Sequence, residues 1–331
     1  MELSEFTGDT KRVNYDRKEH ATMKRRRNNI LVYLFFFVFI AGCGTGNSNI
    51  PDDAFDKGTI HVSADESFKP VIDSQVQVYE AKYPEVKLIV NYKPEADCIR
   101  DLAVDSIRMV IITRRYSKDE EDYMIDTLGI APSQMVIAYD AVAVIVHPLS
   151  PDSLFTMKEL KDVLTGKFKK NLIPVFDGLN ATSTVRFIID SLLRGDSLTK
   201  TTVAATSSEG VIEYVSRTQG AVGFIGVSWI GNKDDAQQRS FLTKVKVAHL
   251  ESTDIPEKYV QPVQANIFAR RYPLIRDLVY ILKESHKGLG HGFAGFMSGE
   301  KGQLIFRRAY LVPAQMQFNV RRTALREESR D

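Results

Sequence analysis

The stretch Gln134-Met-Val-Ile-Ala-Tyr-Asp-Ala-Val-Ala-Val-Ile-Val146 is too long and too apolar for one ordinary β-strand. We interpret it as a strand that leaves one lobe of the protein and continues into a second lobe. Asp140 interrupts the apolar run, and a carboxylate placed there needs a partner or water. Asp140 therefore makes either a hydrogen bond at the hinge or a contact with a ligand.

On the N-terminal side of this stretch, strand and helix patterns alternate. We expect strands at 59–63, 86–90 and 109–112, and helices at 68–79, 97–103 and 118–127. This order predicts a parallel sheet with helices on its faces, and such sheets bind ligands beyond the carboxyl ends of their strands. The candidate ligand-binding residues at these ends are Asp65, Glu66, Ser67, Thr113 and Arg114.

Some of these candidates have an alternative explanation. Asp65 and Glu66 are also suited to cap the helix that follows them. Of Arg114 and Arg115, one is expected to face the cleft and the other the solvent.

On the C-terminal side the order is less regular. Thr156 caps a helix that Gly166 ends, a strand follows at 172–176, and Ser207 and Ser208 start another helix. Further strands are expected at 221–225 and 244–248, and two or three helices between 274 and 308. Trp229 is expected to serve packing only.

The stretch Asn180-Ala-Thr-Ser-Thr-Val-Arg186 is the strongest candidate for a binding site. Thr182, Ser183 and Thr184 precede an apolar-periodic run, as at a helix N-terminus. Backbone N–H groups, three hydroxyls and the Arg186 guanidinium suit an anion such as phosphate or sulfate. Arg186 opposes the helix dipole by ~0.3–1 kcal/mol, which an anionic partner would explain. The alternatives are a simple helix cap, and an arginine that faces the solvent or pairs with an acidic neighbour.

Composition and charge exclude several classes of function. The 331 residues carry a formal charge of +2, but residues 1–42 hold 8 Lys+Arg and 5 Asp+Glu. The remainder holds 44 − 8 = 36 basic and 42 − 5 = 37 acidic residues, a net charge of −1. No general electrostatic attraction to nucleic acid is expected. We find no metal-ligand spacing, cofactor motif or catalytic triad in the sequence, so we expect neither a metal nor a cofactor nor an enzyme.

The N-terminal residues have the pattern of a lipoprotein signal peptide. A basic segment at 24–27 and an apolar segment at 30–41 lead to Ile40-Ala-Gly-Cys43. We expect cleavage after residue 42 and lipidation of Cys43, with a retained transmembrane anchor as the alternative. Met23 stands where such a signal begins, so translation starts at Met1 or Met23. With Cys43 modified, Cys98 has no partner and is expected to be inert.

Five blocks in order resemble one known family. The most specific is Phe155-Thr-Met-Lys-Glu-Leu-Lys-Asp-Val-Leu-Thr-Gly-Lys167. The others are Thr59–Pro70, Ile137–Pro148, Ser207–Gly226, and Phe296–Gln303 with Tyr310–Pro313. Together they resemble the substrate-binding lipoproteins of phosphate ABC importers, in a variant similar to those of Bacteroidetes-type bacteria. The resemblance covers most of residues 58–315.

The resemblance implies an α/β, two-lobed type II periplasmic-binding-protein fold, with mixed, mostly parallel sheets, helices on both faces and a hinge. It implies 43–57 as a tether, 58–138 plus 262–318 as lobe 1, 139–261 as lobe 2 and 319–331 as a tail. Phosphate would lie between the lobes and pass to a membrane permease. The family's Ser/Thr turn corresponds to Ser67, and its second hydroxyl loop corresponds to Thr182, Ser183 and Thr184.

Two positions depart from the family pattern. The family's acidic residue at the third strand falls on or beside Met109, and its arginine before the hydroxyl loop falls near Gly178. Asp65, Glu66 or Asp140 is expected to supply the missing acceptor, and Arg186 or the pair Arg114 and Arg115 the missing cation.

We therefore expect a monomeric, lipid-anchored binding protein of the cell envelope, facing the periplasm or the exterior, that captures phosphate or a similar oxyanion. The alternatives are a different oxyanion or phosphate-containing solute, and a sensor or adhesion lipoprotein that delivers nothing to a transporter. A different ligand stays possible because two residues of the family pattern are missing. A sensor or adhesion role also stays possible, because a fold alone does not determine function.

Overall fold

The computed structural model describes residues 53–129, 131–178 and 182–316. Contacts divide the chain into a unit of residues 1–50 and a unit of residues 51–331, and all of the first lies outside the described residues. So do the predicted signal peptide, Cys43 and the tail at 319–331. Within the described ranges, no helix is long and apolar enough to cross a membrane.

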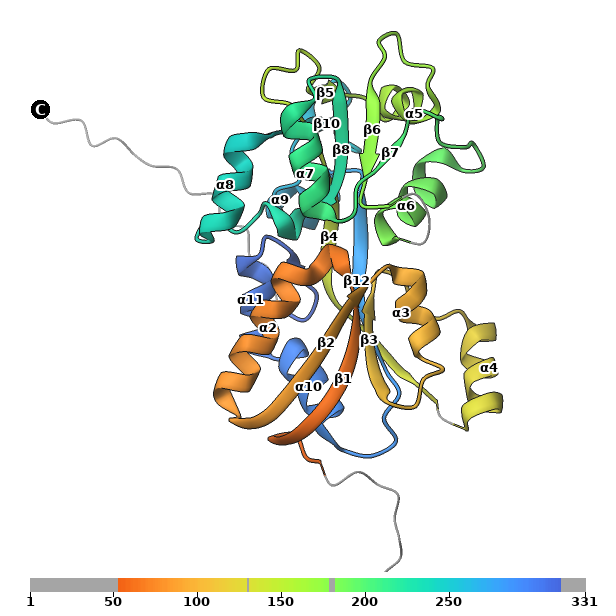
Figure 1. The fold of residues 1–331 in the computed structure, drawn as a ribbon, viewed down its shortest axis with the longest axis vertical. Coiled ribbons are helices and arrows are strands. Elements are labelled where there is room, and N and C mark those ends of the chain that lie inside the picture. Colours follow the sequence, from red (N-terminus) through yellow and green to blue (C-terminus); the bar gives the residue numbers. More distant parts are fainter. Residues whose placement is uncertain (1–52, 130, 179–181, 317–331) are drawn as a thin grey trace, which may run out of the picture. The chain divides into compact units, whose positions relative to one another are not determined.

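Strand β4 (Ser133–Val146) runs through both halves of the second unit, as its sequence predicted. Its residues 133–141 pair antiparallel with β12 (Ile275–Leu282), and its residues 142–146 pair antiparallel with β8 (Ala221–Gly226). Figure 1 shows β4 and β12 at the junction between two groups of elements. We call these groups lobe 1, around β1 to β3, and lobe 2, around β6 to β8.

Lobe 1 is built on parallel strands. The sheet order is β2-β1-β3-β12-β4, with β1 parallel to both of its neighbours and β12 antiparallel to β3. Its strands are β1 (Lys57–Asp65), β2 (Glu85–Lys93) and β3 (Ile107–Ile112). Its helices are η1 (Glu66–Phe68), α2 (Lys69–Lys82), α3 (Glu95–Asp101), α4 (Lys118–Leu128), α10 (Leu289–Ser298) and α11 (Glu300–Arg308).

Lobe 2 continues the same sheet in the order β4-β8-β6-β7. Strand β6 is parallel to both β7 and β8. The elements of this lobe are β6 (Ile173–Phe176), β7 (Val203–Ala204), α5 (Met157–Thr165), α6 (Ser183–Ile188), the π-helix η2 (Ile189–Leu193), α7 (Ser208–Arg217), η3 (Val227–Trp229) and α8 (Ala236–Lys244). Trp229 is buried in one of the hydrophobic clusters of the core, which agrees with its predicted packing role.

Shorter elements complete the unit. Strand β9 (Lys246–Val247) and strand β13 (Val312–Pro313) both pair with β4. A separate three-stranded sheet has the order β11-β10-β5. Its strands are β5 (Leu154–Phe155), β10 (His249–Glu251) and β11 (Tyr259–Val260), and α9 (Gln264–Phe268) follows them. Residues 53–57, the last of the predicted tether, contact lobe 1: Tyr79 donates a hydrogen bond to the Phe55 carbonyl, 2.5 Å away.

The prediction of helix from residue 274 was wrong for its first part, because residues 275–282 form β12. Residues 278–282 are buried on both faces of the strand, so they form a continuous apolar run without alternation. Such a run does not distinguish a buried strand from a buried helix. The pairing of β12 with both β3 and β4 decided the outcome. The helices expected after it are α10 and α11.

The packing of β8 against α7 gives a test of the lobe 2 core. A Cβ atom on Gly223 would lie 2.7 Å from Val215 Cγ2 and 2.8 Å from Val211 Cγ1. We expect Gly223→Ala to lower the free energy of unfolding by about 1–3 kcal/mol through overpacking, as measured by urea denaturation. Gly295→Ala in α10 is the control, because nothing lies within 4 Å of its Cβ position. That variant should gain about 0.5–1 kcal/mol of stability.

Candidate functional site

Three buried hydroxyl groups from the two lobes meet at one point. The Ser67 Oγ lies 3.3 Å from the Ser183 Oγ and 3.4 Å from the Thr184 Oγ1. All three side chains are at most 1% exposed. We call Ser67, Ser183 and Thr184 the hydroxyl cluster. These three sequence-predicted residues are therefore brought together by the fold.

Local sequence positions each half of the hydroxyl cluster. Asp65 ends β1, and its Oδ1 accepts a hydrogen bond from the Ser67 backbone N–H at 2.9 Å. Thr182 caps α6, and its Oγ1 accepts from the Val185 N–H at 3.3 Å. Asp65 and Thr182 thus play the capping roles that the sequence suggested as alternatives. They hold the turns that carry the hydroxyl groups.

Arg276 of β12 supplies the cation of this site, and the sequence reasoning missed it. Its Nη1 donates to the Ser183 Oγ at 3.0 Å and to the Thr184 Oγ1 at 3.3 Å. Its Nε donates to the Asp140 Oδ2 at 2.8 Å, and the two residues are direct partners in the β12–β4 register. The guanidinium also lies 5.0 Å from the centre of the Phe68 ring. The only signal in the sequence was a charged residue beside an apolar run.

Gly226 at the end of β8 allows the backbone to approach this ion pair closely. A Cβ atom there would lie 3.1 Å from the Ser67 carbonyl oxygen and 3.2 Å from the Arg276 Nη2. Both distances are tighter than ordinary van der Waals contact. The site therefore requires a residue without a side chain at position 226.

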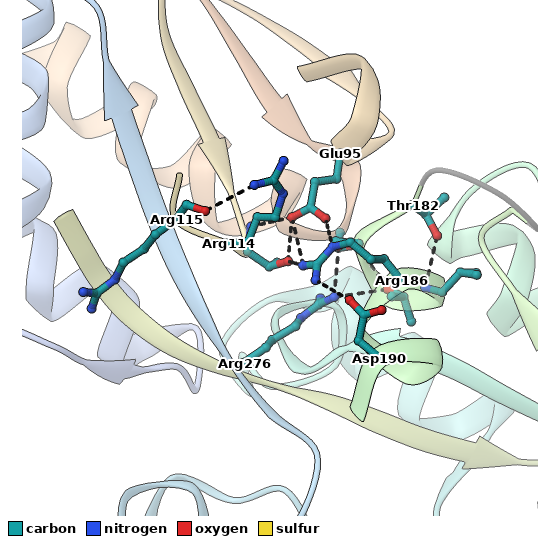
Figure 2. A network of polar contacts seen from close by, with 12 residues as sticks. Glu95, Arg114, Arg115, Thr182, Arg186, Asp190 and Arg276 are labelled. Atoms are coloured by element: carbon teal, nitrogen blue, oxygen red, sulfur yellow. Dashed lines mark hydrogen bonds and ion pairs between the residues drawn. The ribbon is translucent and has the colours of Figure 1, made fainter. Parts of the chain in front are cut away.

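Arg186, the predicted anion-binding cation, forms a different contact between the lobes. Figure 2 shows its guanidinium directed at Glu95 of α3. Its Nε lies 2.5 Å from the Glu95 Oε2, and its Nη2 donates to the Thr113 Oγ1 at 2.7 Å. Burial raises the pKa of Glu95, but hydrogen bonds and the charge of Arg186 lower it overall. The structure therefore places Arg186 in an interlobe ion pair with Glu95, and Thr113 in hydrogen bonds to both partners, rather than at the hydroxyl cluster.

Arg114 and Arg115, the other candidates for the missing cation, also lie away from the hydroxyl cluster. Arg114 forms a bidentate ion pair with Glu120 at the start of α4, with both N–O distances 2.7 Å. Arg115 is exposed and its side chain points away from this network in Figure 2. Neither side chain is directed to the hydroxyl cluster. The physical reason is that Glu120, in the capping box with Ser117, already pairs with Arg114.

Four carboxyl groups surround Arg276 and the hydroxyl cluster. Burial raises the pKa of Asp65 to about 6 and the pKa of Glu66 to about 7. Burial also raises the pKa of Asp140 and of Asp177, although the charge of Arg276 opposes the rise. Glu66 accepts a hydrogen bond from the Ser208 Oγ of lobe 2 at 2.9 Å. Asp177, directly after β6, was not among the predicted site residues.

Several buried polar atoms here have no hydrogen-bond partner among the described residues. They are the Asp65 Oδ2, the Asp140 Oδ1, the Asp177 Oδ1 and the Arg276 Nη2. Buried polar groups are normally satisfied, so a concentration of such atoms marks a place where a polar ligand would supply partners.

A second charged cluster in lobe 1 has a structural explanation. Asp53, Glu284 and His286 offer atoms within 4.8 Å of one another, as a metal site would. The Arg108 Nη1 already lies 2.9 Å from the Asp53 Oδ1 and 2.8 Å from the Glu284 Oε1. An arginine inside the cluster supplies the positive charge that a metal ion would otherwise bring. We therefore assign no metal to it.

The comparisons with known proteins agree with this architecture. The family model of the PBP superfamily domain matches residues 50–301, so the chain belongs to the PBP superfamily. Together with the topology, this confirms the two-lobed type II periplasmic-binding-protein fold. No curated protein matches the chain in sequence.

Two solved structures show the same fold. A Clostridium perfringens protein solved with bound phosphate is 19% identical, with a TM-score of 0.64. The alignment covers 78% of this chain and 100% of that one. An ABC-type phosphate transport receptor from Vibrio cholerae is 16% identical, with a TM-score of 0.58. That alignment covers 76% of this chain and 99% of the receptor.

The Arg276–Asp140 ion pair should be essential to stability. Arg276 is 3% exposed and Asp140 is fully buried, so Arg276→Met leaves an uncompensated buried carboxylate. We expect a loss of about 3–5 kcal/mol in the free energy of unfolding, measured by urea denaturation. The double variant Arg276→Met/Asp140→Asn should recover part of this loss. Equal stability of the single and double variants would contradict the assignment.

The raised pKa values of Asp65 and Glu66 predict a pH dependence of stability. In the folded protein Asp65 keeps its proton up to about pH 6 and Glu66 up to about pH 7, whereas both have lost it above about pH 5 in the unfolded chain. The folded state then binds more protons, so its stability should fall as the pH rises through this range. Thermal unfolding of Glu66→Gln should show a smaller fall than the unchanged protein. If the stability of both proteins depended on pH in the same way, Glu66 would not contribute to this pH dependence.

Proposed function

We propose that this chain is a solute-binding protein that captures phosphate or a similar tetrahedral oxyanion between its lobes for ABC-type import. The observation that carries the proposal is the hydroxyl cluster: Ser67 of lobe 1 meets Ser183 and Thr184 of lobe 2 beside the buried Arg276. Hydroxyl and guanidinium donors in a water-poor setting bind oxyanions through charge-assisted hydrogen bonds.

We propose Arg276 as the cation of the anion site, in place of the Arg186, Arg114 or Arg115 that the sequence suggested. A buried arginine reaches the hydroxyl cluster from β12 although Gly178 stands near the position of the family's arginine. Its charge is held by Asp140 on the neighbouring strand, so the guanidinium is fixed before a ligand arrives. A preorganised donor loses less free energy on binding than a mobile one.

Capture by hinge closure fits the contacts between the lobes. The pairs that join them besides the hydroxyl cluster include Glu95 with Arg186, and Glu66 with Ser208. Both pairs lie on segments that also carry the hydroxyls, because Glu66 precedes Ser67 and Arg186 follows Thr184. Closure would therefore assemble the anion site and the interlobe pairs together, while β4 and β12 bend at the junction.

The proposed cellular role rests on the predicted signal peptide. We infer lipid anchoring through Cys43, a place in the cell envelope facing the periplasm or the exterior, and delivery of the ligand to a membrane permease. The solved relatives named for phosphate and ABC-type phosphate transport support this role. We further propose that the protein acts as a monomer with the lobe boundaries given above, and that it binds its ligand without catalysis.

Isothermal titration calorimetry of the ligand-free protein against phosphate tests the proposal. We expect binding, and we expect Ser67→Ala and Thr184→Ala each to weaken it by about 1–3 kcal/mol through loss of a hydrogen bond to a charged ligand. Ser240→Ala, an exposed hydroxyl of α8, is the control and should bind normally. No heat with phosphate, sulfate, molybdate or arsenate would contradict the proposal.

A further inference from the structure

Glu95 of lobe 1 lies among donors of the kind that hold a bound anion. Its Oε1 accepts hydrogen bonds from the Thr113 backbone N–H at 2.8 Å and from the Thr113 Oγ1 at 2.6 Å. Arg186 of lobe 2 donates from its Nε to the Oε2 at 2.5 Å and from its Nη2 to the Oε1 at 3.4 Å. A backbone N–H, a hydroxyl and a guanidinium are groups that bind oxyanions. The Glu95 carboxylate therefore takes the place of an anion between the lobes.

This contact is buried and charged. Glu95 is 1% exposed. Burial raises the pKa of its carboxyl, but the hydrogen bonds and charge of Arg186 and the hydrogen bonds of Thr113 hold that pKa below its usual value. A buried ion pair gives a net gain only where its geometry is good and further hydrogen bonds satisfy its atoms. Both oxygens of Glu95 have partners, so the pair meets this condition.

Each partner of the pair is also held in place by its own lobe. Thr113 fixes Glu95 within lobe 1. Within lobe 2, the Arg186 Nη1 donates to the Oδ2 of Asp190, four residues along the chain, at 3.1 Å. Few side chains therefore lose freedom when the lobes close and the pair forms, which lowers the cost of forming it.

We propose that Glu95 and Arg186 form a latch that holds the two lobes together whether or not a solute is bound. The negative partner of Arg186 is a side chain of the protein, so the contact needs no ligand. In this arrangement the three side chains of the hydroxyl cluster are at most 1% exposed, so a solute enters or leaves only after the latch opens. Opening then limits both binding and release. This effect on the solute rests on the proposed function, whereas the closure of the lobes does not.

A latch leaves a kinetic signature that a binding residue does not. The pair is present in the closed protein with and without solute, and an interaction that is equal in both states does not change the affinity. Removing the pair should therefore raise the association rate and the dissociation rate together. A residue that touches the solute would instead change mainly the dissociation rate, and the Kd with it.

Stopped-flow measurement of phosphate binding to the full chain tests this signature. Trp229 is the only tryptophan in the sequence, and it lines a pocket together with Lys69 and Pro70 of lobe 1, so its fluorescence reports how the lobes lie. Glu95→Gln keeps the shape of the side chain and an acceptor oxygen but removes the charge. We expect this variant to bind and release phosphate about tenfold faster, with a Kd that changes by less than about threefold.

Glu120→Gln is the matched control, because it removes an ion pair with Arg114 that lies entirely within lobe 1. Both of its rates should equal those of the unchanged protein. If Glu95→Gln weakens phosphate binding at an unchanged association rate, Glu95 acts only after the solute has bound. If Glu95→Gln tightens binding, Glu95 competes with the solute for its donors. Either result overturns the latch.

Small-angle X-ray scattering without phosphate tests the closure directly. The unchanged protein and Glu120→Gln should keep their radius of gyration when phosphate is added, whereas Glu95→Gln should start larger and contract. If the unchanged protein is open and contracts as much as Glu95→Gln, the latch is overturned, whether or not any variant folds. If the unchanged protein binds no phosphate, the proposed function falls, and the scattering of the phosphate-free proteins still decides the latch.

Discussion

The buried ion pair between Arg276 and Asp140 is the interaction on which the rest of the site depends. It joins β12 to β4, the two strands at the junction of the lobes. An arginine without this partner would be costly to bury, and a carboxylate without the arginine equally so. The pair therefore holds a guanidinium at the one place from which it reaches the hydroxyls of lobe 2. Under the proposed function, Arg276 would be a binding residue and a structural residue at once.

The two lobes contribute unlike parts of the site. Lobe 1 brings Ser67 on a turn that Asp65 caps, and lobe 2 brings Ser183 and Thr184 on a turn that Thr182 caps. The hydroxyl groups of one lobe alone would not surround a tetrahedral ligand. Side-chain pairs between the lobes, such as Glu95 with Arg186, also form only when the lobes approach. Closure of the lobes can therefore accompany ligand capture while each helix and strand keeps its own conformation.

The excess of acidic over basic groups at the site also has a physical consequence. The charge of Arg276 acts on three carboxyl groups, those of Asp65, Asp140 and Asp177, and Glu66 lies beside them; burial raises the pKa of all four. A site built only to attract negative charge would not need them. They make the site sensitive to protons, whether those protons belong to the carboxyl groups or arrive with the ligand.

The sequence by itself determined the features that depend on neighbouring residues. It predicted the crossing strand at 134–146, the capped helix after Thr156 and the hydroxyl turns at Ser67 and Thr182–Thr184. Local apolar runs and capping patterns encode these directly. Only the tertiary structure decided which charges reach the hydroxyls. Arg186 is adjacent in sequence but pairs with Glu95, whereas Arg276, 93 residues away from Ser183, reaches it through strand pairing. Such a contact depends on sheet order and register, which no local pattern contains.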